Sequence, residues 1–199
     1  IHAIHEDHNN DLWIGTDKGL YIYDRRSDIF RKFTKKTKDG KSIDKLVQCI
    51  VPDTEGNILI GVYWVGLFKY NPYTDELTSI SYTDGSTTGL SSNGIWNIHA
   101  DSNNIAWIAT VGGGLNRYDM RTGEIQFFYT PDRLSNDITT VIEIDNRTLL
   151  LGTTTNGVWR MDKQTFEMSP YITDQDEEMY VRCIQQFGDK VYSGTENGL

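Results

Sequence analysis

A segment of about nine residues recurs five times along the chain, and this repeat limits the fold more than any other feature of the sequence. The copies read LWIGTDKGL at 12–20, LIGVYWVGL at 59–67, WIATVGGGL at 107–115, LLGTTTNGV at 150–158 and YSGTENGL at 192–199. The small residues at their centres, Gly15, Gly61, Ala109, Gly152 and Gly194, follow one another at intervals of 46, 48, 43 and 42 residues. A fixed period of this length predicts one structural unit repeated five times.

Short apolar runs flank each copy, and turn-forming residues separate them. The runs are rich in Ile, Val, Tyr, Phe, Trp and Thr, and those at 20–24 (LYIYD) and 115–119 (LNRYD) alternate apolar with polar side chains. This period of two is typical of strands, and no window keeps a helical pattern over three turns. Four antiparallel strands in a repeat of about 40–50 residues form the blade of a β-propeller.

The sequence therefore predicts an all-β β-propeller segment over residues 1–199. We expect four complete four-stranded blades, at approximately 1–40, 41–84, 85–133 and 134–175, and part of a fifth at 176–199. Because a propeller protects its end blades by closing into a ring, we expect a fragment of a larger ring of about seven blades. The alternative is that two copies of the chain form a homodimer and cover each other's open flanks.

Two positions in the repeat have a predicted packing role. The small central residue leaves room where neighbouring blades crowd together, and the bulky residue two positions before it packs between blades. The bulky residues are Trp13, Leu59, Trp107, Leu150 and Tyr192. The glycine before each third strand, such as Gly19, suits a tight turn.

The composition excludes several classes of protein. Of 199 residues, 38% are hydrophobic and 24% are charged, which is typical of a globular protein. The net charge of −9 disfavours nucleic acid as a partner. Since no stretch approaches the roughly 20 consecutive apolar residues of a membrane helix, we expect any membrane attachment to lie in other parts of the protein.

In three of the units, a longer segment that encloses all or part of the nine-residue copy resembles the repeat of a known family. HNNDLWIGTDKGLYIYD at 8–24, DTEGNILIG at 53–61 and DSNNIAWIAT at 101–110 are similar to the regulator-propeller repeat of bacterial two-component sensors. The linkers GLSSN at 89–93 and LSND at 134–137 resemble the LSNN segment of that family, and KSID at 41–44 does so more weakly.

The resemblance implies a periplasmic sensor domain of the kind found in Bacteroides-type hybrid histidine kinases. It also implies carbohydrate sensing, in which an oligosaccharide or another small extracellular ligand binds the propeller. The signal then passes to a histidine kinase that lies outside this chain. On this reading the segment is not itself an enzyme and has no cofactor.

Positions that differ between the five units, while the residues around them follow the repeat, are candidate ligand contacts. In the first strand, the residue after the leading apolar one is His2, Gln48, Trp96, Thr139 or Arg182. In the loop between the second and third strands, blade two carries Tyr63 and Trp64 where other units have small polar residues. Aromatic faces beside hydrogen-bonding side chains suit an oligosaccharide, although tolerated substitution explains the same pattern.

Other motifs favour structure over chemistry. His2, His5 and His8 cannot converge from one strand, so no metal site is predicted. The acidic segments 53–57 and 101–104 lack the distal ligand of a calcium loop and are expected to be tight turns. Cys49 and Cys183 hold the same first-strand position in different blades, so we expect two small buried residues and no disulfide.

Three alternatives concern binding and function. The basic segment 24–45 holds nine Lys or Arg against four Asp, which suits a solvated edge strand or, less simply, an acidic-glycan site. A propeller enzyme of lyase or lactonase type, with polar groups gathered at the channel mouth, is the main rival to the sensor. A scaffold that binds a protein partner through its broad face is the other.

Overall fold

The computed structural model describes residues 1–85, 88–130, 136–172 and 179–198, and every regular element in these ranges is a β-strand. In the described part of the chain, eighteen strands form four four-stranded sheets and one two-stranded sheet, each with consecutive strands paired antiparallel. The prediction of four complete blades and part of a fifth is confirmed.

The strand bounds follow the repeat. Blade one contains β1 (Ala3–Glu6), β2 (Leu12–Thr16), β3 (Gly19–Asp24) and β4 (Ile29–Lys32). Blade two contains β5 (Val47–Pro52), β6 (Ile58–Val62), β7 (Gly66–Asn71) and β8 (Glu76–Ile80). Blade three contains β9 (Ile95–Ala100), β10 (Ile105–Thr110), β11 (Gly114–Asp119) and β12 (Ile125–Phe128). Blade four contains β13 (Ile138–Asp145), β14 (Thr148–Thr153), β15 (Val158–Asp162) and β16 (Met168–Ile172), and blade five contains β17 (Val181–Phe187) and β18 (Lys190–Thr195).

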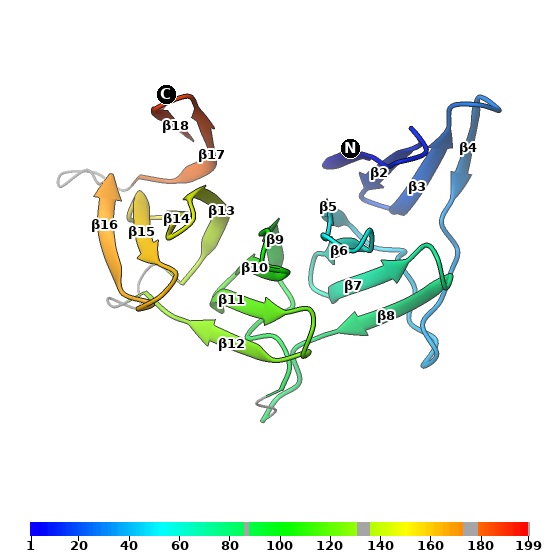
Figure 1. Ribbon diagram of the computed structural model, residues 1–199, viewed down its shortest axis with the longest axis horizontal. Helices are drawn as coiled ribbons and strands as arrows, with labels where there is room; N and C mark the ends of the chain where they lie inside the picture. Colours follow the sequence, from blue (N-terminus) through cyan, green and yellow to red (C-terminus); the bar gives the residue numbers. More distant parts are fainter. Residues whose placement is uncertain (86–87, 131–135, 173–178, 199) are drawn as a thin grey trace.

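The blades stand side by side in an open arc (Figure 1). The first strand of each blade lies on the inside of the arc, the fourth strand lies on the outside, and the two chain ends face each other across the opening. Successive first strands are neighbours, from β1 and β5 through β9 and β13 to β17. We call the end of the blades that carries the turns between second and third strands the upper end, and the end that carries the turns between first and second strands the lower end.

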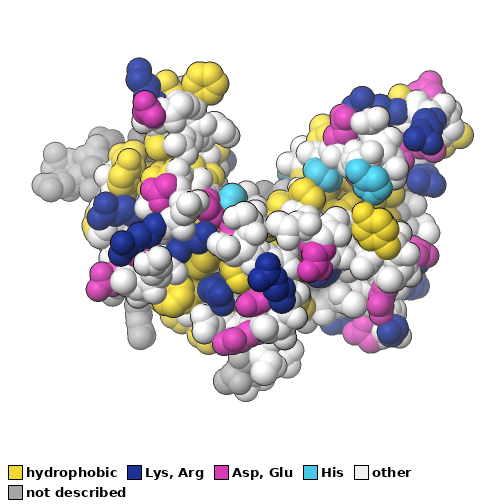
Figure 2. All heavy atoms as spheres, viewed as in Figure 1, with side chains coloured by type: hydrophobic (Ala, Val, Ile, Leu, Met, Phe, Trp, Pro, Cys, Tyr) yellow, Lys and Arg dark blue, Asp and Glu magenta, His cyan; other side chains and the backbone are white. Residues whose placement is uncertain are grey.

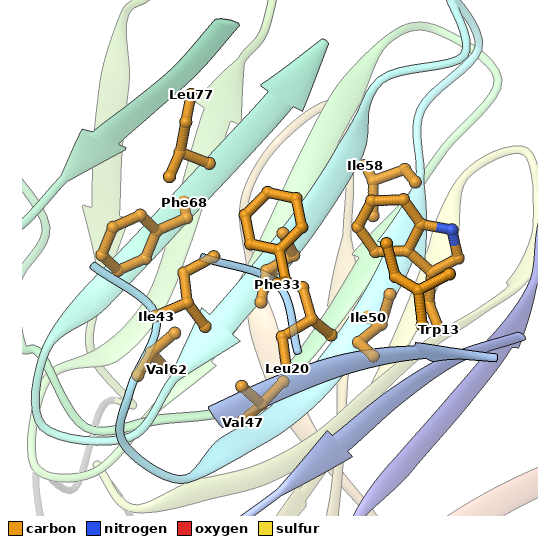
Figure 3. Close-up of a cluster of buried hydrophobic side chains, with 12 residues drawn as sticks. Trp13, Leu20, Phe33, Ile43, Val47, Ile50, Ile58, Val62, Phe68 and Leu77 are labelled. Atoms are coloured by element: carbon orange, nitrogen blue, oxygen red, sulfur yellow. The ribbon is translucent and has the colours of Figure 1, made fainter. Parts of the chain in front are cut away.

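Each pair of adjacent blades encloses a separate apolar core. Between blades one and two, Trp13 and Phe33 from blade one pack with Ile50 and Phe68 from blade two (Figure 3). The rings of Trp13 and Phe33 have centroids 5.6 Å apart and both approach Tyr70. Further clusters fill the spaces between blades two and three, three and four, and four and five.

The predicted inter-blade residues are buried in the first four blades and exposed in the fifth. Trp13, Leu59, Trp107 and Leu150 are each at most 4% exposed, whereas Tyr192 is 44% exposed. The expectation that both cysteines are buried is likewise correct for Cys49 and wrong for Cys183, which is exposed. Both differences have one cause, because no described blade packs on the far side of β17 and β18.

The small central residues of blades one, two and four, which are Gly15, Gly61 and Gly152, meet the first strand of the next blade, as predicted. A Cβ atom on Gly15 would lie 2.8 Å from both Cγ1 and the carbonyl oxygen of Val47 in β5. One on Gly152 would lie 2.6 Å from Cγ1 of Val181 in β17. A side chain at these positions would therefore push adjacent blades apart.

The acidic and basic segments also have structural roles. Asp53 Oδ1 accepts hydrogen bonds from the backbone N–H groups of Glu55 and Asn57, so this segment is the expected tight turn. In the basic segment, Lys35 pairs with Asp75, and Lys38 Nζ lies 2.7 Å from Glu76 Oε1 at the edge of blade two. Among the described residues, no helix has the length and apolar character that a membrane span requires.

Candidate functional site

A β-bulge near the start of the first strand holds four of the seven predicted ligand residues at the upper end. In β5, Val47 faces Val62 and Cys49 faces Gly61, which leaves Gln48 as the extra residue of the strand. The same shift in register leaves Trp96, Thr139 and Arg182 without a direct partner in β9, β13 and β17. A bulge of this kind turns a side chain away from the regular alternation of the strand.

Blade two and blade three together form an aromatic group at this end. The ring centroids of Tyr63 and Trp64 are 5.4 Å apart, and those of Tyr63 and Trp96 are 5.6 Å apart. Tyr63 and Trp96 are half-buried, while Trp64 is 60% exposed. We call these three residues the upper aromatic group; of the seven predicted ligand residues, the structure brings these three together.

Trp64 has an unusual backbone conformation. Its φ angle is +57°, in the left-handed region, where a bulky side chain costs about 1–2 kcal/mol. At the equivalent turn position of blade three the residue is Gly112, with φ +68°. The turn thus favours glycine, and blade two nevertheless presents a large indole ring to solvent from it.

The indole nitrogen of Trp96 is a second unusual feature of this group. Trp96 Nε1 is buried and has no hydrogen-bond acceptor among the described residues. Most buried donors in proteins have a partner, and one that lacks a partner calls for an explanation. The indole ring that carries this donor packs beside the ring of Tyr63, where the upper aromatic group joins the two blades.

The other four predicted ligand residues have separate positions. His2 Nε2 lies 2.8 Å from Asp17 Oδ1, and Arg182 Nη2 donates to Glu196 Oε1 at 2.6 Å. Thr139 is 6% exposed, and its hydroxyl lies within hydrogen-bond distance of the carbonyl oxygens of Val181 and Gly152. Gln48 is half-buried in its bulge. The roles of all seven residues in ligand binding remain predictions.

A second variable position, which sequence reasoning missed, faces the variable residue of the first strand. His2 and Arg182 pair with the residue two positions after the small residue of the second strand, which is Asp17 in blade one and Glu196 in blade five. Tyr63 is the residue of blade two at that position. Alignment of the five copies on their small central residues places Asp17, Tyr63 and Glu196 at one position. The hydrogen bond from His2 lowers the pKa of Asp17.

The electrostatic character of the surface is mixed. Figure 2 shows basic and acidic side chains interspersed on the side of the arc that Figure 1 presents. Within the described ranges, no three His, Cys, Asp or Glu side chains are grouped as metal ligands would be. Burial raises the pKa of the Cys49 thiol to about 12, so this cysteine is protonated at neutral pH.

The comparisons with known proteins agree with this architecture. The family model described as two component regulator propeller matches residues 1–18. None of the curated proteins compared with the sequence matches it. The predicted resemblance to regulator-propeller repeats is confirmed by the family match and by the solved structures that the chain resembles.

Two of these structures are extracellular domains from B. thetaiotaomicron proteins described as hybrid two component systems. The domain of BT3049 has a TM-score of 0.83 and 20% sequence identity, and that of BT4673 has 0.83 and 19%. In both cases the match covers 98% of this chain and 27% of the other, so the chain spans about a quarter of their length. The computationally designed protein Ika8 is also similar, with a TM-score of 0.69, 16% identity, and coverage of 98% of this chain and 55% of Ika8. Residues 1–18 thus carry the two component regulator propeller repeat, and the chain has the propeller fold of these extracellular domains.

Proposed function

We propose that this chain is part of the extracytoplasmic, ligand-sensing propeller of a two-component sensor and has no catalytic role of its own. The family match at residues 1–18 and the likeness to extracellular domains of hybrid two component systems support this proposal. The protein is then located in the periplasm, and the signal reaches a histidine kinase outside these residues.

The ligand in this proposal is an oligosaccharide that stacks on the upper aromatic group. The observation that carries it is the left-handed conformation of Trp64, an exposed indole in a turn where blade three uses glycine. Unfavourable backbone conformations concentrate at functional sites, because a binding role can outweigh their cost. The apolar face of a sugar ring packs well on such an aromatic surface.

The hydrogen-bonding groups around these rings suit a polyhydroxylated ligand. The half-buried Gln48 holds, relative to Tyr63, the position that His2 holds relative to Asp17, and its amide offers both a donor and an acceptor. Sensing also requires that the ligand bind one of two states of the sensor more tightly. The upper aromatic group joins two blades, so a ligand bound there contacts two structural units at once.

Isothermal titration calorimetry of the full-length protein with a panel of plant and host oligosaccharides tests this function. We expect at least one glycan to bind, and Trp64→Gly to weaken its affinity by about tenfold or more. Tyr73→Ala is the matched control, because Tyr73 is 73% exposed in the same blade but lies at the lower end. A folded protein that binds none of the glycans, or one whose affinity does not change in Trp64→Gly, would refute the proposal.

A further inference from the structure

A cleft at the lower end separates blades one and two. Its volume is about 460 Å³, within the roughly 300–1,000 Å³ of small-molecule sites. The floor includes Trp13, Ile22 and Ile58, and blade two contributes Tyr70 and Pro72 to one wall. Pro52 and Gly56 of blade two and polar residues of blade one line the rest. We call this space the lower cleft; it lies at the other end of the blades from the upper aromatic group.

The lower cleft contains one of three equivalent aspartates. Asp7, Asp53 and Asp101 each begin the turn between the first and second strands, and each accepts backbone N–H groups of that turn through Oδ1. In addition, Trp13 Nε1 donates to Asp7 Oδ2 at 2.9 Å, and Trp107 Nε1 donates to Asp101 Oδ2 at 3.2 Å. Asp7 and Asp101 therefore have the same local structure.

The three aspartates differ in their cationic partner. Lys163 Nζ lies 2.8 Å from Asp101 Oδ2, and Lys69 Nζ lies 3.3 Å from Asp53 Oδ2. For Asp7, no Lys, Arg or His nitrogen of the described chain lies within the 4.0 Å of an ion pair. Two of the three sites thus hold an ammonium group from the chain itself, and the third does not.

The repeat explains why the ammonium group is absent. Lys163 follows the last residue of the third strand in blade four, and the equivalent residue of blade two is Pro72. Lys69 is the fourth residue of its third strand, and the equivalent residue of blade one is Ile22. Pro72 and Ile22 both line the lower cleft. The cleft therefore lies where a lysine side chain reaches the aspartate in other blades.

Apart from Asp7, the lower cleft still carries more negative than positive groups, with two carboxylates against one guanidinium. Glu6, Asp11 and Arg31 also line it, and Glu6 is already paired with Arg25 at 2.6 Å. Burial holds the pKa of His5 below its ordinary value, against the pull of Asp7 and Glu6, so its imidazole is neutral at neutral pH. The Tyr70 hydroxyl donates to Asp75, which leaves its aromatic ring as the part that faces a ligand.

We propose that the lower cleft binds a small organic amine whose ammonium group occupies, beside Asp7, the place that Lys163 Nζ takes beside Asp101. The carboxylate supplies a charge-assisted hydrogen bond, and the ring of Tyr70 adds a cation–π contact. The apolar part of the amine lies over the floor of Ile22 and Ile58. This second site is independent of the oligosaccharide proposed for the upper end.

Titration of the full-length protein with n-pentylammonium chloride, followed by NMR at pH 7, tests the proposal. We expect saturable binding of the amine, and at least tenfold weaker binding of n-pentanol and sodium pentanoate, which have the same alkyl chain without the positive charge. Trp64→Gly should leave amine binding unchanged, so failure of the oligosaccharide proposal and failure of this one are distinguishable. Equal affinity for the amine and the alcohol, or no binding of the amine, overturns the inference.

Two variants make the test specific for the aspartate. Pro72→Lys copies Lys163 and supplies an internal ammonium group to Asp7, so amine affinity should fall at least tenfold while the melting temperature rises. Ile22→Lys copies Lys69 and serves if the first variant does not fold. Pro72→Ala is the matched control and should still bind the amine. Undiminished amine binding by a folded lysine variant overturns the proposal.

Discussion

Lys163 of blade four lies between two carboxylates, 2.8 Å from Asp101 Oδ2 of blade three and 2.8 Å from Glu143 Oε2 of its own blade. The Lys163 side chain is 8% exposed and that of Asp101 is 1% exposed. Burial opposes the charged forms, yet hydrogen bonding between the two raises the pKa of Lys163 and lowers that of Asp101. This ion pair therefore joins blades three and four.

Loss of the lysine charge should destabilise the protein strongly. In Lys163→Met, Asp101 remains buried without its cation, and we expect the free energy of unfolding to fall by about 3–5 kcal/mol. Methionine is the residue of blade three at this position, Met120, so the shape is acceptable. Urea denaturation measures the change. The control is Arg147→Met, which breaks an ion pair whose arginine is 58% exposed, with an expected loss below about 1 kcal/mol. Equal losses in the two variants would contradict the prediction.

Replacement of Trp64 by glycine should not weaken the fold. Glycine adopts the left-handed region without strain, which offsets its greater freedom in the unfolded chain. We expect the free energy of unfolding of Trp64→Gly to stay the same or rise by up to about 1 kcal/mol. Gly112→Ala is the converse variant, and its Cβ would meet no atom within 4 Å. We expect its free energy of unfolding to fall by about 1 kcal/mol, because of the backbone conformation alone. Thermal denaturation compares them, and a clear loss of stability in Trp64→Gly would show that the indole is structural.

A methyl group on Gly15 should separate blades one and two. In Gly15→Ala, the new Cβ meets both the side chain and the carbonyl oxygen of Val47 at 2.8 Å, so we expect a loss of about 1–3 kcal/mol. Adding Val47→Ala removes the contact with the side chain but keeps the one with the carbonyl oxygen, and its rescue should be partial. Additive losses in a double-mutant cycle by urea denaturation would show that the two residues do not interact.

Acid should destabilise the protein through two histidines at the same repeat position. Burial lowers the pKa of both His5 and His99 from the ordinary 6.5, and neighbouring carboxylates only partly oppose this. Below about pH 6.5 the unfolded chain therefore binds more protons than the folded one, and stability decreases as the pH falls. Urea denaturation at pH 7.5 and 5.5 should show a smaller difference in the His5→Gln, His99→Gln double variant than in the wild type. An unchanged difference would assign the pH dependence to other groups.

The repeat predicted the strands and their packing because both depend on a local pattern. A small residue every 42 to 48 positions, with an aromatic or leucine two residues earlier, is readable without coordinates, and the inter-blade contacts of Gly15 and Trp13 follow from it. The exposure of Cys183 was not predictable in this way, because burial at one repeat position depends on whether a neighbouring blade is present.

The candidate sites were only partly predictable. Differences between the repeat units identified Tyr63, Trp64 and Trp96 as candidates. The left-handed conformation of Trp64 is a property of the backbone, and the sequence did not predict it. The partnership of Asp101 with Lys163 joins residues 62 positions apart in different blades, and it becomes recognisable once the sheets are in place. Comparison of equivalent positions across blades, rather than along one strand, reveals that Asp7 lacks such a partner.

Under the proposed sensing function, the bulges in β5, β9, β13 and β17 separate ligand recognition from folding. In each of these strands one amino acid stands outside the hydrogen-bonded ladder, so its identity can be exchanged while the residues on either side keep their cross-strand neighbours. Glutamine, tryptophan, threonine and arginine occupy the four places. A protein built in this way can acquire a new specificity through single replacements around the inner rim, with its cores left intact.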